Sequence, residues 1–527
     1  MNSFPHSIDI IPGAMLWTVG SEMSKDLTGR IAQFQAFLDD LQVPGIIENV
    51  PSYTTILVIY DETVISRTSV VDLLTECWER ALSAPPSGGQ SNVTVDVVYG
   101  DNVGDDLANV SSNTGLSVEE VITLHVSTPY TVGAVGFAPG FTYLIGLPES
   151  LATPRRSTPR LRVPAGSVGI GGNQTGIYAL PSAGGWNLIG RTPTQLFDPF
   201  ADPPVKLKLG DQVRFRQIES ADFSSVLAKE QLPRGDGPIE VVTPGMQTTV
   251  QDLGRYGYAR YGFATDGAAD RASLVAANRL VGNAPEVSAL EITHLGPTLR
   301  FHRRLSMAIV GADLGARLNN RPIPVGRRFE TMPGDELSFV PVPNAGGARA
   351  YLAVKGGFDV PLVMGSASTN LTAGIGGWYG RALLKGDRLP VGQSQLSDSS
   401  FAPGMQTRTV VDAGLPFRIV PGPQRDRFDD DTWKRLVGET FTVSEDANRV
   451  GIRLQGPSLA PTAGADMVSE GIVTGSIQVT GEGQAIVMLP GHATIGGYTK
   501  IATVIADNWD RLGQCSPGDS IRFTENT

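Results

Sequence analysis

Cysteine and histidine are scarce in this sequence. Only two of its 527 residues are cysteines, Cys77 and Cys515, and they stand far apart in the chain. This excludes a disulfide framework and any cysteine-rich zinc or iron–sulfur site. The five histidines are scattered rather than grouped. We therefore expect no metal site of the histidine-rich or cysteine-rich kind, although carboxylates alone could hold a Mg²⁺ ion, and we assign no metal ligand in this chain.

Charge and long apolar runs are scarce as well. Charged residues make up 18% of the chain, against about 25% in an average soluble protein. The formal net charge is -11, and an acidic chain is a poor binder of nucleic acid. No run approaches the roughly 18 apolar residues that a membrane-spanning helix requires, and residues 1–20 lack the basic and apolar regions of a signal peptide. We expect a cytoplasmic protein that binds neither nucleic acid nor membranes.

The signatures of several enzyme classes are absent. The sequence has no G-x-x-x-x-G-K-[ST] phosphate loop, no H-E-x-x-H or G-x-S-x-G motif, and no Met-Lys-Met segment that could carry biotin. Glycine-rich segments at 169–176 and 374–380 lack the spacing and the βαβ context of a dinucleotide-binding fold. We therefore expect that the chain holds neither ATP nor a covalent cofactor by itself.

Glycine and proline are abundant instead. The 62 glycines and 37 prolines, with 41% hydrophobic residues, are typical of many short strands joined by tight turns around several cores. The first hundred residues differ from this pattern. Apolar spacings of three and four predict helices over 27–41 and 69–82, and strand-like runs cover 53–61 and 93–100. Together they predict a small α+β unit at the N-terminus.

A weak repeat predicts where the later units close. Residues 209–218, 333–342 and 517–526 each combine a Gly-Asp turn with an alternating strand that reaches phenylalanine at the sixth position from the glycine. Three such closures predict three barrel-like units, and the polar segment at 219–238 is typical of a linker. We predict five parts: an N-terminal α+β subdomain (1–95), a first barrel (96–222), a linker (223–237), a second barrel (238–395) and a third barrel (396–527).

Two long segments carry a family resemblance. Residues 125–193, with GFAPGFTYLIGLP and VPAGSVGIGGNQTGIY, closely resemble subunit 1 of the so-called allophanate hydrolases, a family that includes the B-type component of 5-oxoprolinase and the Kip-type kinase inhibitor. Residues 250–301, beginning VQDLGRYG, resemble subunit 2, which includes the C-type component of 5-oxoprolinase and the Kip antagonist. That second match continues through residues 365–387, 448–457, 469–489 and 496–505. The two subunits look fused into one polypeptide.

The resemblance implies a fold and a choice of functions. The fold is mainly β with the N-terminal α+β unit, and contains about three cyclophilin-like β-barrels. The first functional hypothesis is a B/C-type component of an ATP-dependent 5-oxoprolinase, a hydrolase that opens 5-oxo-L-proline to L-glutamate with a separate A-type subunit. The alternative is the carboxyltransferase component of a urea carboxylase-like system. A third is a non-catalytic regulator that binds a sensor kinase.

These hypotheses also fix the expected partners. ATP with Mg²⁺ would come through the A-type subunit, or carboxybiotin through a biotin carboxylase and its carrier protein. The substrate would be a small amide or lactam. Assembly of the chain into a homo-oligomer is left open.

Candidate site residues in the first half lie among glycines. Arg155, Arg156, Arg160 and Arg162 could hold a carboxylate or phosphate, or could be solvated arginines on a strand rim. Gln174 could face a ligand or belong to a structural turn, and Trp186 could stack on a flat ureido or lactam group or lie in the core. Tyr143 is expected in the core. The substrate-binding candidates here are Arg160, Ser167, Gly172, Gln174 and Trp186.

In the second half, Glu291 stands among apolar neighbours. If it is half-buried with a raised pKa it could act as general base, whereas a buried structural carboxylate bonded to backbone amides is the other reading. Arg381 and Lys500 are the basic residues that we expect to bind a carboxylate or an oxyanion. These three are the catalytic candidates. The substrate-binding candidates are Gln251, Asp252, Arg255, Gln478, Gly496, Gly497 and Tyr498.

Asp252 and Arg255 are spaced for a local salt bridge, and Asp270 for the first turn of a helix. The last segment departs from the family pattern Asp-x-x-Thr-x-Gly-Gly-Tyr-Pro-Lys, because Gly491 replaces the aspartate and Thr499 the proline. Ala367 also changes the usual Gly-Ser-Arg-Ser-Thr run. We expect the site to lie between the two halves, with Gln174 and Trp186 facing the three catalytic candidates.

Overall fold

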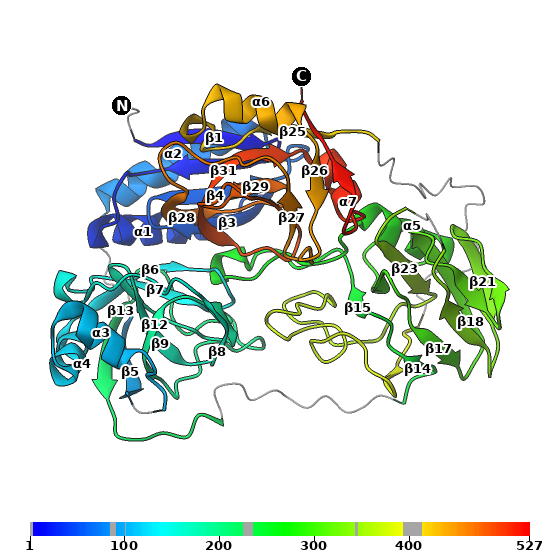
Figure 1. Ribbon diagram of the computed structural model, residues 1–527, viewed down its shortest axis with the longest axis horizontal. Helices are drawn as coiled ribbons and strands as arrows, with labels where there is room; N and C mark the ends of the chain where they lie inside the picture. The colour runs from blue at the N-terminus through cyan, green and yellow to red at the C-terminus, as the bar shows by residue number, and fades with distance from the viewer. Residues whose placement is uncertain are drawn as a thin grey trace.

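The computed structural model describes residues 4–84, 91–100, 102–224, 236–342, 346–393 and 414–526. Within these ranges the chain folds into four units, which Figure 1 shows in blue, cyan to teal, green to yellow, and orange to red. The mainly β fold with an N-terminal α+β unit is confirmed. None of the helices in the described ranges is long and apolar enough to cross a membrane.

The N-terminal unit is a four-stranded antiparallel sheet with two helices against it. The sheet order is β1-β2-β4-β3. Its elements are β1 (His6–Ile11), β2 (Ala14–Thr18), α1 (Lys25–Leu41), β3 (Ile46–Ser52), β4 (Thr55–Tyr60) and α2 (Arg67–Ser83). The predicted helices over 27–41 and 69–82 are confirmed as parts of α1 and α2. Phe34 of α1 and Leu74 of α2 are fully buried in one core cluster with Val58 of the sheet. The apolar residues spaced by three and four thus form the buried faces of the two helices.

The second unit is a closed seven-stranded barrel. Its order is β10-β7-β6-β13-β5-β12-β9. The strands are β5 (Asn92–Tyr99), β6 (Tyr130–Val135), β7 (Thr142–Ile145), β9 (Ser167–Gly171), β10 (Gln174–Ile177), β12 (Asn187–Arg191) and β13 (Gln212–Gln217), with α3 (Leu107–Thr114), α4 (Val118–Ser127), η1 (Glu149–Leu151) and the hairpin of β8 (Arg160–Val163) and β11 (Ser182–Gly184) outside. The predicted closing strand at 209–218 is β13. The boundary that we predicted after residue 95 is misplaced, because it cuts through β5.

The third unit consists of two sheets. Six strands run in the order β20-β19-β22-β17-β14-β24, and five in the order β15-β16-β23-β18-β21. The strands are β14 (Ile239–Thr243), β15 (Gln247–Gln251), β16 (Ala289–Thr293), β17 (Thr298–Phe301), β18 (Leu305–Gly311), β19 (Ala316–Leu318), β20 (Arg321–Pro322), β21 (Arg327–Thr331), β22 (Glu336–Phe339), β23 (Arg349–Val354) and β24 (Arg388–Leu389), with η3 (Ala259–Tyr261) and α5 (Arg271–Leu280). The predicted strand at 333–342 contains β22.

The fourth unit is a nine-stranded sheet that nearly closes. Its path runs β32-β26-β27-β30-β29-β31-β25-β33, with β28 paired to β31, and its two end strands are neighbours in sequence. The elements are β25 (Phe417–Pro421), η5 (Arg425–Arg427), α6 (Asp430–Gly438), β26 (Phe441–Val443), β27 (Gly451–Gln455), β28 (Asp466–Gly471), β29 (Ser476–Val479), β30 (Ala485–Met488), β31 (Ile495–Val504), η6 (Ala506–Asn508), α7 (Trp509–Leu512), β32 (Ser520–Ile521) and β33 (Phe523–Glu525). The predicted closing strand at 517–526 is confirmed as β32 and β33.

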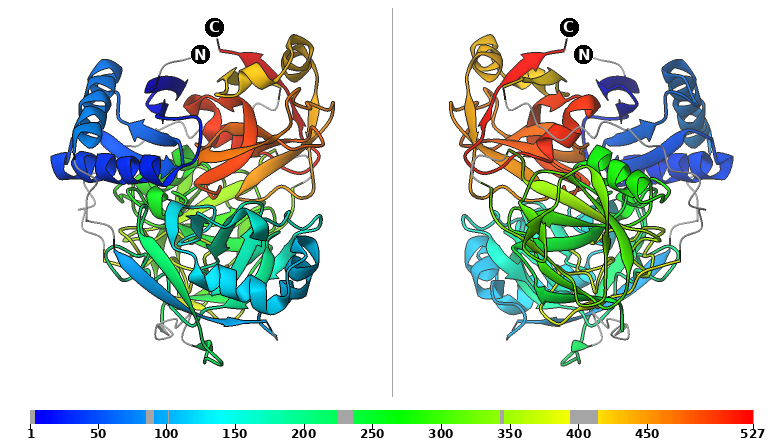
Figure 2. Two further views of the ribbon diagram at one scale, coloured as in Figure 1. Left: turned by 90° about the vertical axis from the view of Figure 1, so that its left-hand side faces the viewer. Right: turned by 90° about the vertical axis from the view of Figure 1, so that its right-hand side faces the viewer.

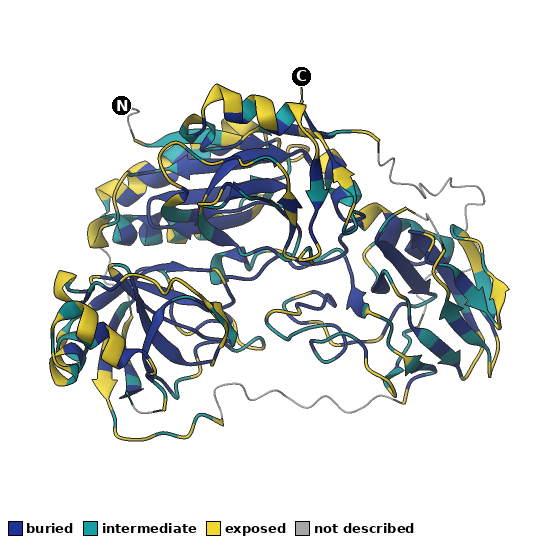
Figure 3. Ribbon diagram, in the orientation of Figure 1, coloured by how far each residue is buried: buried dark blue, intermediate teal, exposed yellow. Residues whose placement is uncertain are grey.

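The first and last units pack on each other. The blue and orange-red units lie side by side in both views of Figure 2, although they are farthest apart in sequence. Ser52 Oγ of β3 donates a hydrogen bond of 2.6 Å to the Ser469 carbonyl of β28. At Gly471 a Cβ would lie 2.3 Å from Leu57 Cβ, so only glycine allows this approach. Figure 3 shows the sheets of both units as buried.

Candidate functional site

The C-terminal unit buries a lysine beside a carboxylate. Lys500 on β31 is 0% exposed, and its Nζ lies 2.7 Å from Oε1 of Glu470, which is 5% exposed on β28. At this distance the ammonium and the carboxylate form a buried ion pair. Gln424 holds the pair in place, because its Nε2 donates to Glu470 Oε1 at 2.7 Å and its Oε1 accepts from the Lys500 N–H at 3.1 Å.

The predicted residues of this segment share one face of the sheet. Gln478 on β29 pairs with Lys500, and Gly496 pairs with Glu470, so these side chains point to the same side of the sheet as Tyr498. The amide nitrogen of Gln478 is buried without a hydrogen-bond partner among the described residues. A Cβ at Gly496 would lie 3.0 Å from that nitrogen. A buried ammonium and a buried amide donor therefore stand together, a combination that suits a carboxylate or a developing oxyanion.

Gly497 and Tyr498 take different places in the same strand. A Cβ at Gly497 would lie 2.9 Å from the Met467 carbonyl, which makes this a close approach between β31 and β28. Tyr498 is 41% exposed. The strand therefore runs from an exposed tyrosine to a fully buried lysine.

Asp252 and Arg255 do not pair with each other, contrary to the local salt bridge that their spacing predicted. Asp252 accepts hydrogen bonds from the hydroxyls of Ser366 and Ser368 and from the Ala367 N–H. Arg255 donates instead to Asp266 Oδ2 at 2.8 Å and to the Ser368 carbonyl at 2.6 Å. Both residues lie beside the segment in which Ala367 replaces the family's arginine.

Asp266 is the carboxylate that completes this cluster. It is buried at a positive φ of 52°, and Asn370 Nδ2 donates to the same Oδ2 as Arg255, at 2.8 Å. Burial raises the pKa of Asp266 to about 6, against the opposing charge of Arg255. Gln251 at the end of β15 donates to Thr249 Oγ1 and to the Thr369 carbonyl, and its own Oε1 is buried without a partner among the described residues.

Glu291 is a buried structural carboxylate. Its Oε2 accepts from the Ala269 N–H at 2.9 Å and from Tyr351 Oη at 2.7 Å, while its Oε1 binds Arg449. Arg349 lies 3.6 Å from the same oxygen. Although burial alone would raise it, the pKa of Glu291 is held below its ordinary value, chiefly by Arg449 and Arg349. The raised pKa expected for a general base is therefore wrong. The hydrogen bond from the Ala269 amide fits the alternative reading.

The other predicted carboxylate at a helix start has the structural role expected of it. Asp270 is the N-cap of α5, and its side chain accepts from the Ser273 N–H at 2.9 Å. Gln514 of the C-terminal unit also donates to it, at 2.7 Å. Asp270 therefore helps to fix the third unit against the fourth.

Arg381 is held by a nearby carboxylate. It forms two hydrogen bonds with Asp387, of 2.7 and 2.9 Å, and donates to the Ala382 carbonyl. The bond to Asp387 raises the pKa of Arg381. Glu291 and Lys500 have partners of their own, Arg449 and Glu470. The three catalytic candidates therefore stand in three separate clusters.

In the first barrel, Gln174 faces the N-terminal unit, whereas Trp186 packs against residues of the barrel itself. Gln174 Nε2 donates to Tyr53 Oη at 2.8 Å. Trp186 is 5% exposed and packs edge-on against Phe141 and Tyr143, with ring centroids 5.6 and 5.8 Å away. Trp186 and Tyr143 both lie in the core, which was the expectation for Tyr143 and one of the two readings of Trp186. The expectation that Gln174 and Trp186 face the three catalytic candidates finds no support in these contacts.

The remaining first-half candidates are structural in their contacts. Arg160 and Arg156 both bind the buried carboxylate of Asp106, at 2.9 and 2.7 Å. Gly172 turns the chain from β9 to β10 at a positive φ of 66°. Ser167 is buried in β9, where its carbonyl accepts from the Tyr178 N–H at 2.9 Å.

Residues that sequence reasoning missed complete two of these clusters. Glu470 and Gln424 surround Lys500, and Arg449 neutralises Glu291. Arg449 also contacts the segment in which Gly491 replaces the family's aspartate. The Gly491 N–H donates to the Arg449 carbonyl at 3.1 Å, and a Cβ at Gly491 would lie 2.9 Å from that oxygen. Glu470 is the only charged residue between 467 and 481, and this isolation was the one hint of its role in the sequence.

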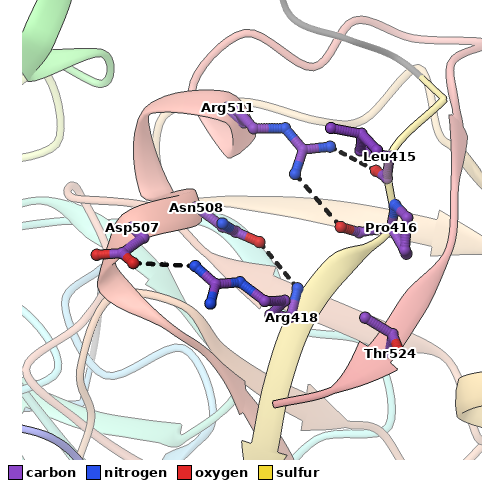
Figure 4. A pocket seen from close by; sticks show the side chains of 7 residues that line it. All are labelled: Leu415, Pro416, Arg418, Asp507, Asn508, Arg511 and Thr524. Carbon is purple, nitrogen blue, oxygen red and sulfur yellow. Dashed lines mark hydrogen bonds and ion pairs between the residues drawn. The ribbon is translucent and has the colours of Figure 1, made fainter. Parts of the chain in front are cut away.

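A surface cavity of about 680 Å³ lies elsewhere on the C-terminal unit (Figure 4). Its lining is Leu415, Pro416, Arg418, Asp507, Asn508, Arg511 and Thr524. Arg418 donates to Asp507 at 2.9 Å, and Arg511 donates to the Pro416 carbonyl at 3.3 Å. No sequence-predicted site residue lines this cavity. Within the described residues, no group of three or more histidine, cysteine, aspartate or glutamate side chains could hold a metal ion.

The fold combines an α+β unit with a closed barrel and two further β units, and the polar clusters lie between and within these units. The chain belongs to the carboxyltransferase domain family: residues 261–525 match subdomain A and B, and residues 10–207 match subdomain C and D. A crystal structure of TTHA0988 has the same fold over the whole length. It superposes with a TM-score of 0.83 at 34% identity, covering 97% of this chain and 99% of that one.

Curated relatives match the two halves separately. The C subunit of the 5-oxoprolinase of Escherichia coli (strain K12) is 39% identical over 287 residues, 54% of this chain and 91% of the relative. The B subunit of the 5-oxoprolinase of Escherichia coli O157:H7 is 46% identical over 175 residues, 33% of this chain and 79% of the relative. Urea amidolyase of Lachancea kluyveri is 34% identical over 309 residues, 54% of this chain but 17% of that protein. The chain is thus similar to two separate subunits at once.

Proposed function

We propose that the chain is a fused B/C-type component of an ATP-dependent 5-oxoprolinase, which hydrolyses 5-oxo-L-proline to L-glutamate with a separate A-type subunit. The observation that carries this proposal is the presence, in one polypeptide, of regions similar to both the B-type and the C-type components of that enzyme. A function related to 5-oxoprolinase and a role as an enzyme component follow from these relatives.

In this proposal the buried Lys500 stabilises the negative charge that develops during the reaction. 5-Oxo-L-proline carries a carboxylate and a lactam carbonyl, and opening the lactam places negative charge on the carbonyl oxygen. An ammonium fixed by Glu470 and Gln424 would stabilise such an oxygen, together with the Gln478 amide nitrogen, which has no partner among the described residues. Because these groups are buried, their electrostatic effect would be larger than at the surface.

Glu291 and Arg381 receive other roles in this proposal. Glu291 anchors Arg449 between the third and fourth units, and Arg381 fixes Asp387 in the third unit. Neither is proposed to exchange a proton with substrate. ATP and Mg²⁺ are assigned to the A-type subunit, and ATP would supply the activated phosphoryl group there.

A second candidate is a carboxyltransferase component that moves a carboxyl group from carboxybiotin to urea or a similar amide. The family match itself favours it, since both parts of the chain match carboxyltransferase subdomains. Lys500 and Gln478 would then bind the carboxyl group that is being transferred. A biotin carboxylase and a biotin carrier would replace the A-type subunit.

Reconstitution separates the two candidates. The purified chain is mixed with an A-type subunit, ATP and 5-oxo-L-proline, and in parallel with a biotin carboxylase, a biotinylated carrier, bicarbonate and urea. ATP hydrolysis that requires 5-oxoproline only in the first mixture supports the proposal. Carboxylation of urea, with no response to 5-oxoproline, would favour the second candidate.

A further inference from the structure

The hairpin of β8 and β11 stands outside the first barrel and carries a concentration of positive charge. We call residues 154–163 and 182–185, which include the loop that leads into β8, the basic hairpin. Residues 150–197 contain five arginines and no aspartate or glutamate, in a chain whose net charge is -11. Four of these arginines lie within residues 155–162. Figure 1 shows β8 at the margin of the teal unit. The hairpin is therefore a basic patch on an acidic protein.

Two of the four arginines fix the hairpin to the barrel. The carboxylate of Asp106 is 4% exposed, and it accepts from Arg156 Nη1 at 2.7 Å and from Arg160 Nη2 at 2.9 Å. Its other oxygen accepts from the Leu188 N–H of β12 at 2.7 Å. The Arg156 N–H also donates to the Gly185 carbonyl at 2.8 Å, which joins the loop to the end of β11. A partner would therefore meet a surface that is already formed, which lowers the cost of binding.

The other two arginines and a leucine are left facing water. Arg155 and Arg162 are exposed, and neither forms an ion pair with another described residue. Arg155 lies over the ring of Trp186, 5.9 Å from its centroid. Leu161, next to Arg162, is 96% exposed, against at most 65% for the other exposed large hydrophobic side chains in the described part of the chain. Two unpaired cations thus stand beside an apolar side chain that is almost wholly in water.

The hairpin also has an open strand edge. In the described part of the chain β8 pairs with β11 alone, as a two-stranded sheet. Such an edge presents backbone N–H and C=O groups to which a further extended segment can bond. Charged side chains commonly protect an open edge from unwanted pairing, and this accounts for the arginines. It leaves the exposure of Leu161 unexplained, because a protective edge gains nothing from an apolar side chain in water.

We propose that the basic hairpin is the docking site for an extended, acid-rich segment of a partner protein. This inference rests on the proposed function, under which the partner is the A-type subunit. Carboxylates of that segment would pair with Arg155 and Arg162, an apolar side chain would cover Leu161, and its backbone would extend β8. Nucleic acid fits the patch less well, since the net charge of the chain repels phosphate and a leucine gives no contact to a charged backbone.

Titration with the A-type subunit tests the docking site. Glutamate formation from 5-oxo-L-proline and ATP is measured at a fixed concentration of the full chain and rising concentrations of the A-type subunit. Arg155→Glu combined with Arg162→Glu should raise the half-saturating concentration of that subunit about tenfold. Leu161→Ser should raise it about tenfold as well, because the apolar contact is lost. The rate at saturation should stay unchanged, since none of these residues belongs to the Lys500 cluster.

Matched variants separate docking from general effects of charge and polarity. Arg214→Glu combined with Arg303→Glu reverses the same number of charges at exposed positions outside the hairpin. Leu362→Ser makes the same change as Leu161→Ser at a leucine that is 65% exposed in the third unit. Both controls should keep the half-saturating concentration of the parent. Raising the salt to about 0.5 M should weaken the parent more than the hairpin double variant, because screening acts on the charges that remain.

The outcomes distinguish this inference from the proposed function. Glutamate formation with the same half-saturating concentration in the parent and the hairpin variants would overturn the docking site and leave the function standing. Sedimentation that shows the A-type subunit binding the parent but not the hairpin variants, without glutamate formation, would support the docking site and overturn the function. No binding to the parent would overturn both. Self-association of the parent that Leu161→Ser abolishes, with binding of the A-type subunit unchanged, would identify a second copy as the occupant and overturn the proposal.

Discussion

Lys500 and Glu470 form an ion pair that is almost completely withdrawn from water, with Nζ and Oε1 2.7 Å apart. β28, which carries Glu470, is also the strand that packs on the N-terminal sheet through the Ser52–Ser469 hydrogen bond. The position of the lysine therefore depends on contacts between the first and last units of the chain. The fusion of the two subunit-like halves therefore helps to place the Lys500 ammonium.

Replacing Lys500 by methionine should slow catalysis strongly and also weaken the fold. We expect turnover to fall by about 100-fold, the effect of losing one oxyanion-stabilising group. Removing one partner of a buried pair leaves the other charge unpaired, which costs about 3–5 kcal/mol of stability. The double variant Lys500→Met, Glu470→Gln should regain most of that stability but not the activity. An active double variant would exclude a catalytic role for Lys500.

Replacing Glu291 by glutamine should affect stability far more than chemistry. Its carboxylate neutralises the buried Arg449, so we expect a loss of about 3–5 kcal/mol in the free energy of unfolding. Glu330→Gln is the control, because its pairs with Arg304 and Arg328 lie near the surface and should contribute less than about 1 kcal/mol. If folded Glu291→Gln protein loses turnover by orders of magnitude with unchanged stability, the structural assignment is wrong.

The first barrel should become less stable in acid because of His125. This side chain is fully buried between Tyr99 Oη at 2.8 Å and Thr175 Oγ1 at 2.9 Å, and burial lowers its pKa from 6.5 to about 3. A lowered pKa means that its contribution is present above pH 6.5 and is lost as the pH falls, by about 1.4 kcal/mol per pH unit. Urea unfolding at pH 7.0 and 5.5, followed by a probe in this barrel, measures the difference.

His125→Gln should flatten this acid dependence, because glutamine cannot take up the proton. His302→Gln provides the comparison, since His302 is partly exposed beside Glu240. An acid sensitivity of the first barrel that is equal in all three proteins would show that another group is responsible.

Gly171→Ala should destabilise the first barrel by crowding Trp186. A Cβ at this position would lie 2.7 to 2.9 Å from three atoms of the indole ring, inside ordinary contact distance. Overpacking of this kind costs about 1–3 kcal/mol. Gly438→Ala in α6 meets no atom within 4 Å and should be neutral or slightly stabilising. Thermal unfolding compares the two, and equal midpoints would contradict the packing described for Trp186.

The fold was predictable from the sequence where a single helix or turn is determined by its own residues. The apolar stripes of α1 and α2 and the Gly-Asp turns before β13, β22 and β32 are local features, because a helix face or a tight turn is decided within a few residues. The boundary after residue 95 failed for a different reason. β5 pairs in parallel with β13, more than a hundred residues later, and this pairing assigns it to the barrel.

The sequence indicated which candidate residues share a strand segment, but not which partners they bind. Lys500, Gln478 and Gly496 do lie on one face of a sheet. The sequence could not show that Arg255 pairs with Asp266 rather than Asp252, or that Arg449 neutralises Glu291 from 158 residues away. Such pairs are decided by the packing of separate units, so the raised pKa expected for Glu291 became a lowered one once two arginines were placed beside it.

The most direct test of the proposed function measures L-glutamate. The purified chain and an A-type subunit are incubated with ATP and 5-oxo-L-proline, and glutamate is quantified with either protein omitted in turn. We predict glutamate formation that requires both proteins and ATP and that is lost in the Lys500→Met, Glu470→Gln double variant. Glutamate formation by the A-type subunit alone, or none with both proteins present, would contradict the account.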